Sequence, residues 1–211
     1  MKRNHYILML IALFVSMTAS AQSIEKLTIN GATYLLVSTE GMPVTSQWPM
    51  GYKMTDANGR TIRHQNHEGI GGNPNLNSRM SHRFIVAPYD TWTAESWSAG
   101  MGVAGTEDTK MQATSPVADR GCPKMNLGNR KWRMPTLREL ELMWVFRSVL
   151  RQVYTTDLRD EQKGPMGQAK YWSATEADDT EAYAVDFTDS APWAGAATKT
   201  ESHLSRCVSD Y

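Results

Sequence analysis

Four carboxylates between two expected strands form the group of side chains in this sequence that could most readily hold a cation. Calcium prefers several hard oxygen ligands, and the acids of this short stretch could supply them: Glu176, Asp178, Asp179 and Glu181. The alternative is an ordinary solvated turn, which is the commoner role of such a run. We therefore expect no metal and no cofactor, and keep these four residues as weak candidates for a metal site.

Seven tryptophans could serve carbohydrate binding, because flat aromatic faces stack on sugar rings. Trp132, Trp144 and Trp172 lie within apolar patterns, which predicts burial in the core. Trp48 and Trp193 lie in loop-like contexts instead, and they are the better candidates for contact with a ligand. Core packing is the alternative for both.

The histidines that follow the N-terminal segment show no spacing typical of a metal or catalytic site; they are His64, His67, His82 and His203. A motif such as His-Glu-x-x-His would place two ligands on one face of a helix, and the chain has none. Sets of Ser, His and Asp can be chosen from any chain of this length, so they carry no information alone. We expect no catalytic residue and a protein that is not an enzyme.

The first 21 residues have the order of a cleavable signal peptide. Lys2 and Arg3 precede an apolar run of about ten residues, which is shorter than the roughly 20 that a transmembrane helix needs. Ala19 and Ala21 are the small residues expected before the cut. We expect cleavage after Ala21, no membrane span, and a mature protein in the periplasm, at the cell surface or in the medium.

Charge and cysteine content narrow the possible partners of the protein and the state of its cysteines. The chain has 22 basic and 22 acidic residues, and this balance argues against nucleic acid as a partner, which would require a strongly basic face. Cys122 and Cys207 are the only cysteines. In an exported chain an even count favours a disulfide, and two free thiols are the alternative.

Turn residues predict a β-rich start. Asn30-Gly31 between two apolar runs predicts a hairpin over residues 25–37, and a second turn at 56–59 predicts a short hairpin over 52–62. Residues 64–81 are polar and glycine-rich, which predicts a long loop. A strand is expected over 83–88, and a short helix from Thr91 or Thr93 to Gly100.

The strongest helix signal begins at Thr136, which forms a capping box with Glu139. Apolar residues then recur at near-helical spacing, predicting one helix to about Tyr154. Arg133 and Glu139 flank its start, and we expect them to fix the loop and the cap. Three strands are expected afterwards, over residues 169–174, 182–187 and 203–208; in the second, alternate residues should share one face of a half-buried strand.

Six short segments resemble, in the same order, a known family of exported domains: Trp92, Cys122, the run Gly128–Leu140 containing Trp132-Arg133-Met134-Pro135-Thr136, Tyr171–Glu176, Tyr183–Phe187 and Arg206-Cys207-Val208. The chain resembles the C-terminal domain of a bacterial collagen-like adhesin (Lcl C-terminal-like) and the related major paralogous (FISUMP-type) domains. The resemblance covers roughly residues 81–211. Met134 stands where the family more often has leucine, a change that should be nearly neutral.

The resemblance implies an α+β, C-type-lectin-like domain over residues 81–211: a twisted antiparallel sheet with one or two helices and long loops. Residues 22–80 would precede it as an extension rich in β-hairpins. It also implies a structural disulfide between Cys122 and Cys207. The sugar-binding motifs of calcium-dependent lectins, such as Glu-Pro-Asn, are absent from the chain.

The function implied by the resemblance is adhesion or ligand binding. The partner would be an extracellular protein or glycan, or another subunit of a fimbrial or cell-surface assembly. The alternative is a secreted or periplasmic enzyme, because formylglycine-generating enzymes share the fold distantly. Such an activity would require a reactive cysteine pair.

Overall fold

A computed structural model describes residues 22–55, 57, 59–61, 78–91, 93–104, 116–156, 166–167, 169–188 and 193–211. The predicted signal peptide, Trp92 and most of the loop predicted over 64–81 lie outside these residues. Within the described ranges, no helix has both the length and the apolar character needed to cross a membrane.

Four antiparallel strands form the first sheet, in the order β1–β2–β3–β7: β1 (Ser23–Ile29), β2 (Ala32–Ser38), β3 (Arg83–Val86) and β7 (Val208–Asp210). The hairpin predicted at its edge is confirmed. Asn30 and Gly31 have φ values of 52° and 80°, and positive φ at both central residues is what a type I′ turn requires. The second predicted hairpin appears as one antiparallel bridge between Thr55 and Thr61; residues 56, 58 and 62 are not described.

This sheet joins the expected N-terminal extension to the rest of the chain. Strand β2, which lies before the expected boundary at residue 80, pairs with β3, which lies after it. Strand β3 in turn pairs with β7 near the C-terminus. Whether residues 22–80 are an independent domain was open from the sequence. The pairing shows that their hairpin shares a sheet with the C-terminal strand.

Three antiparallel strands form the second sheet: β4 (Lys170–Glu176), β5 (Glu181–Asp186) and β6 (Trp193–Thr198). The first two were predicted, and β6 was not. Its Ala-Gly-Ala-Ala centre has low β propensity and no alternation, so it depends on backbone pairing with β5. The strand predicted over 203–208 is wrong in extent, because only Val208 enters a sheet, while His203 and Leu204 form isolated bridges.

The first predicted helix is shorter than expected. Helix α2 spans Trp97–Met101 with Ser96 at its N-cap position, so a start at Thr91 or Thr93 is wrong. The reason is tertiary: Thr91 N donates to Ser205 O and Glu95 N to His203 O, both at 2.9 Å. These bonds hold Thr91 and Glu95 against the C-terminal segment.

The long predicted helix consists of two: α3 (Leu137–Val145) and α4 (Arg147–Thr156), separated at Phe146. The capping box of Thr136 and Glu139 is confirmed at the start of α3. In one continuous helix, Arg147 would share the buried face of Met143 and Leu150, because these positions are three or four residues apart. With the break, the Arg147 guanidinium lies 3.7 Å from the ring centroid of Trp144.

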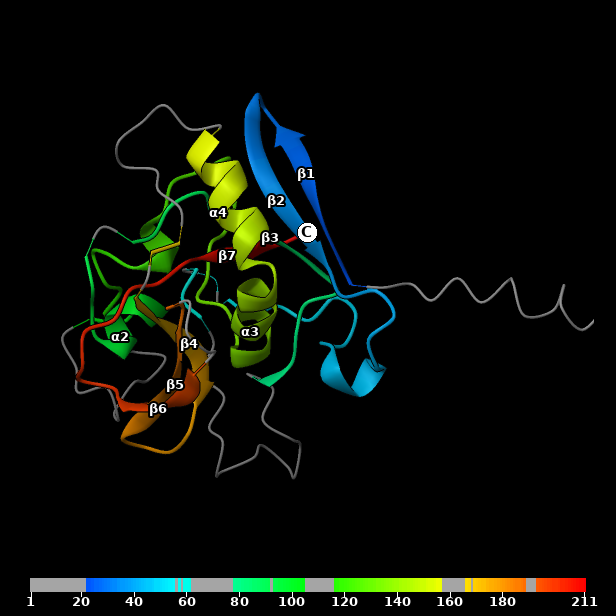
Figure 1. Cartoon of the computed structure of the whole chain (residues 1–211). Coiled ribbons are helices and arrows are strands. Elements are labelled where there is room, and N and C mark those ends of the chain that lie inside the picture. Colours follow the sequence, from blue (N-terminus) through cyan, green and yellow to red (C-terminus); the bar gives the residue numbers. More distant parts are fainter. Residues whose placement is uncertain are drawn as a thin grey trace, which may run out of the picture.

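The core has two parts, which meet at β4 and β5. One contains Trp97, Trp132, Trp172 and both cysteines, and the other contains Leu140, Leu150, Tyr171 and Phe187. The alternation predicted over residues 182–187 is confirmed, although both faces are buried: Ala182 and Ala184 belong to the first part of the core, and Val185 and Phe187, which follows β5, belong to the second. The molecule is therefore α+β with two antiparallel sheets. In Figure 1, α4 lies beside the β1–β2 hairpin, and the β4–β5–β6 sheet lies toward the α3 end.

Candidate functional site

A pocket of about 360 Å³ lies between residues 89–95 and residues 119–126. Five of its lining side chains can be charged: Asp90, Glu95, Asp119, Arg120 and Lys124. A cavity of this size can enclose one small ligand group. Buried and exposed charges meet there around an open volume, and we take it as the candidate functional site.

The first wall is fixed by backbone hydrogen bonds to the C-terminal segment. Glu95 N donates to His203 O, and His203 N donates back to Glu95 O at 3.1 Å. The indole Nε1 of Trp172 also donates to Glu95 O, at 2.8 Å. Because three bonds hold its backbone, Glu95 presents its side chain from a fixed position.

The second wall is fixed by a glycine and the disulfide. Gly121 has a φ of 84°, and a Cβ there would lie 2.2 Å from the carbonyl oxygen of Ala99. Only glycine permits this approach to α2. The next residue, Cys122, is bonded to Cys207, with 5.5 Å between the Cα atoms, which confirms the predicted disulfide. Both walls are thus attached to residues 203–207.

Glu95 is the chemically unusual residue of the pocket. Its side chain is 1% exposed, and Oε1 accepts no hydrogen bond from any described residue. Burial raises the pKa of Glu95 to about 7, outweighing the lowering by the Thr91 hydroxyl and the Arg120 guanidinium. Near neutral pH both the neutral and the ionised forms are therefore populated, a property typical of functional carboxyls.

Arg120 neutralises Glu95 incompletely. Its Nε lies 3.9 Å from Glu95 Oε2, and its side chain is 62% exposed. This distance is too long for a hydrogen bond, and an exposed guanidinium is screened by water. Glu95 therefore has a nearby opposite charge, and its Oε1 has no hydrogen-bond partner in the described part of the chain.

Asp90, on the same wall, is fully compensated. One carboxylate oxygen accepts from Arg206 Nε at 2.6 Å, and the other from the Tyr171 hydroxyl at 2.9 Å. Arg206 is buried and also donates to Ala87 O at 3.1 Å. Burial and the charge of Asp90 raise the pKa of Tyr171, so its hydroxyl remains a donor. Asp90 contributes a fixed, balanced pair to the pocket edge.

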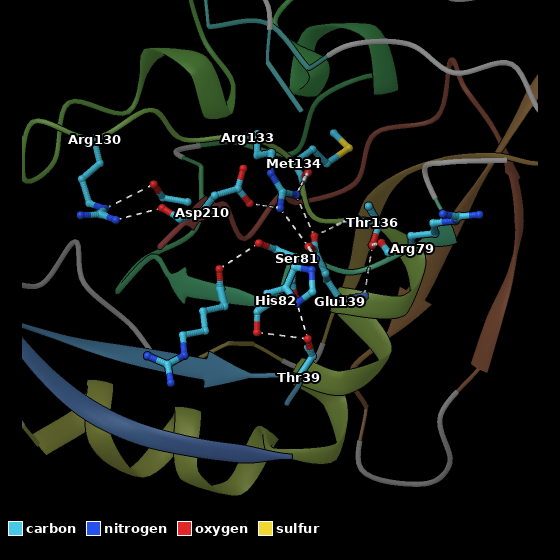
Figure 2. A network of polar contacts seen from close by, with 12 residues as sticks. Thr39, Arg79, Ser81, His82, Arg130, Arg133, Met134, Thr136, Glu139 and Asp210 are labelled. Atoms are coloured by element: carbon cyan, nitrogen blue, oxygen red, sulfur yellow. Dashed lines mark hydrogen bonds and ion pairs between the residues drawn. The ribbon is translucent and has the colours of Figure 1, made fainter. Parts of the chain in front are cut away.

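A second polar network holds the start of α3. In Figure 2 the guanidinium of Arg133 lies between the carboxylates of Glu139 and Asp210. Arg133 donates to both oxygens of Glu139 at 2.7 and 2.8 Å and to Asp210 Oδ1 at 2.6 Å. Burial lowers the pKa of Arg133, but the two carboxylates outweigh that effect and raise it.

Glu139 also accepts from the backbone N–H groups of Thr136 and Ser81, at 2.9 and 2.8 Å. With these bonds, Arg133 and Glu139 fix the loop and the cap, as expected from the sequence. The carboxylate is fully engaged with protein donors, so the network serves the architecture.

The two tryptophans predicted to contact a ligand lie elsewhere in the structure. Trp48 is 4% exposed and stacks on Tyr52, with 4.9 Å between ring centroids. Trp193 is 45% exposed and lies on β6, where its ring covers Gly195 so closely that a side chain there would clash with it. Neither lines the Glu95 pocket. Ligand binding by Trp48 or Trp193 stays a prediction.

The four acids of residues 176–181 do not share a ligand sphere. Glu176 Oε1 accepts from the buried ammonium of Lys199 at 2.7 Å, and Lys199 also donates to the carbonyl oxygens of Asp178 and Asp179. Asp178 Oδ1 accepts from the N–H groups of Thr180 and Glu181. The cation at this turn is Lys199, and no group of three or more metal-binding side chains was found among the described residues.

Sequence reasoning missed the pocket itself. Glu95 offered one signal, an acid between Trp92 and Trp97, two large side chains that favour burial. Arg120 offered none, because the disulfide and Gly121 bring it to the pocket. Of the four histidines considered in the sequence, the structure describes His82 and His203, while His64 and His67 lie outside the described residues. The rings of His82 and His203 lie against Trp48 O and Trp172 respectively.

No protein-family model matches this chain, and no curated protein matches it significantly. The pocket must therefore be interpreted from its own geometry and chemistry.

Proposed function

We propose that this chain is an exported, non-enzymatic binding module with a C-type-lectin-like fold, and that the Glu95 pocket holds its ligand. The carrying observation is the buried Glu95 carboxylate, whose Oε1 accepts no hydrogen bond from a described residue and which lines the pocket. A buried polar group left unsatisfied costs about 1–3 kcal/mol. A ligand that donates to Glu95 would offset this cost.

Two observations support a function outside the cytoplasm. Cys122 and Cys207 form a disulfide, and disulfides persist in oxidising compartments. The N-terminal sequence has the order of a signal peptide. The resemblance to exported adhesin domains fits the same setting and suggests a glycan, an extracellular protein or a surface-assembly subunit as the partner.

The cysteines also favour binding over catalysis. Both are completely buried in the disulfide, and the chain has no free thiol. An enzyme of the formylglycine-generating type would need a reactive thiol. Proton transfer by Glu95 alone would need a second group to act with it, and the neighbouring carboxylate of Asp90 is already engaged by Arg206 and Tyr171.

Binding of residues 22–211 to arrays of glycans and matrix proteins tests the proposal. Glu95→Gln should weaken the ligands found by at least about tenfold, the effect expected for loss of a charged hydrogen bond. Asn126→Trp, which fills the pocket from its exposed wall, should weaken them as well. Glu25→Gln, on the exposed face of β1, is the matched control and should bind as the wild type does.

Circular dichroism should first establish that each variant is folded. Ligands that bind wild type and both pocket variants equally would contradict the proposal. So would a complete absence of binding by the wild-type chain.

A further inference from the structure

We infer that the ligand presents an ammonium group to the Glu95 pocket and takes the position that Arg120 holds beside this carboxylate. The inference rests on the proposed function and names the chemistry of the group that the pocket recognises.

The first argument compares the three buried glutamates of the described structure: Glu95, Glu139 and Glu176. Glu139 is bonded to the buried Arg133 at 2.7 Å, and Glu176 to the buried Lys199 at 2.7 Å. Each of these cations is 1% exposed. Only Glu95 faces a mostly exposed cation at a distance without a hydrogen bond. The fold supplies a buried cation for two of the acids and leaves the third position open.

The second argument concerns the charges around Glu95. From its own segment it is faced by Thr91, from α2 by Gly100 and from residues 119–126 by Arg120; the titratable residue of the C-terminal segment that pairs with its backbone is His203. The other charged groups at the pocket are the Asp90–Arg206 pair, Asp119 and Lys124. Together, Asp90, Glu95 and Asp119 balance Arg120, Lys124 and Arg206, so the pocket has one net negative charge once Arg120 moves away from Glu95.

The third argument is that Arg120 can leave. Its side chain is 62% exposed and its guanidinium makes no hydrogen bond to Glu95. Exposed ion pairs contribute little stability, so displacement of Arg120 into solvent costs little. A ligand ammonium has three N–H donors in a compact group and could approach the carboxylate closely, as Lys199 approaches Glu176.

Ionised Glu95 is required for this interaction, so proton uptake should compete with the ligand. With the pKa of the free site at about 7, the affinity for a ligand that keeps its proton, such as n-butylammonium, should be constant at higher pH. Below pH 7 it should fall about tenfold per pH unit, because binding must then release one proton.

Three sugars with the same ring test the charge of the ligand in titrations of residues 22–211, followed by NMR at pH 7, where the amine of glucosamine is still mostly protonated. Glucosamine carries an ammonium group, N-acetylglucosamine is neutral, and glucuronate is an anion. We expect glucosamine and n-butylammonium to shift the resonances of the pocket, and the neutral and anionic sugars to bind at least about tenfold more weakly.

Two variants should act in opposite directions. Glu95→Gln, which keeps the shape of the side chain, should abolish ammonium binding. Arg120→Gln removes the competing cation and should tighten it severalfold, whereas Lys124→Gln is the matched loss of a positive charge elsewhere on the pocket. Weaker binding by Arg120→Gln, or stronger binding of glucuronate than of glucosamine, would overturn the inference.

The failure of this inference can be told from the failure of the proposed function. Array ligands that are neutral or anionic, yet lost in Asn126→Trp, would leave the binding pocket standing and refute the ammonium. Array ligands indifferent to Asn126→Trp would refute both.

Discussion

Individual charged residues show how this fold places charge in its interior. Arg133, Lys199 and Arg206 are buried, and each is bonded to a carboxylate within 2.7 Å. Removal of two charges from water is costly unless the pair is well bonded, and these pairs meet that condition. Glu95 does not, which is why its pKa rises.

The raised pKa of Glu95 predicts a stability that depends on pH. The carboxyl titrates near 4.5 in the unfolded chain and near 7 in the folded protein. Between these values the folded state holds the extra proton, so the free energy of unfolding should fall as pH rises from 4.5 to 7. Glu95→Gln should remove this loss and stabilise the chain by about 1–2 kcal/mol at pH 8, after allowance for solvent screening.

Urea denaturation of both proteins at several pH values measures this effect. Burial lowers the pKa of His203, close to Glu95 in the structure, and this contributes a stability that is lost as pH falls. Because His203 is present in both proteins, the difference between the two curves isolates Glu95. A difference that does not change between pH 5 and pH 8 would refute the assignment.

The helices, strands and turns differ in whether residues nearby in sequence are enough to specify them. Asn30-Gly31 and the Thr136–Glu139 capping box specify their turn and helix start through bonds within a few residues, and both could be predicted. Strand β6 could not be, because its Ala-Gly-Ala-Ala centre has low β propensity and depends on pairing with β5. The positions of Thr91 and Glu95 could not be either, because both residues bond to the distant C-terminal segment. The pocket was missed for the same reason, since its two walls meet only through residues 203–207.

The start of α3 depends on one carboxylate, which gives a prediction at the scale of the element. Glu139 accepts from Arg133, Thr136 N and Ser81 N. Glu139→Gln keeps the side-chain shape but leaves Arg133 with only the half-exposed Asp210 as a charged partner. We expect a loss of about 3–5 kcal/mol in the free energy of unfolding, measured in urea.

Glu141→Gln, on the same helix and only partly buried, is the control and should change stability by no more than about 0.5 kcal/mol. A Glu139→Gln protein as stable as this control would show that the ion pair contributes nothing to holding the helix start.

In the whole molecule, residues 203–210 connect the separate parts. They pair with β3 through β7, with Glu95 through His203, and with residues 119–126 through the disulfide. Elements far apart in the chain therefore share one C-terminal attachment. A change at this segment should affect stability and the pocket together.

The disulfide provides the prediction for this scale. It joins two residues that are 85 apart in sequence, and closing a loop of that length contributes about 4–5 kcal/mol of stability in the chain-entropy model. The double variant Cys122→Ser, Cys207→Ser should lose about this much in urea denaturation. Its 119–126 wall should also exchange amide hydrogens faster than β5, because the wall loses its covalent attachment whereas β5 keeps both neighbouring strands.

A reducing agent should destabilise the wild type and leave the double variant unchanged. If the variant matched the wild type in stability and in exchange of its 119–126 wall, hydrogen bonds and the packing of Gly121 would suffice to build the pocket, and the disulfide would have no part in positioning it.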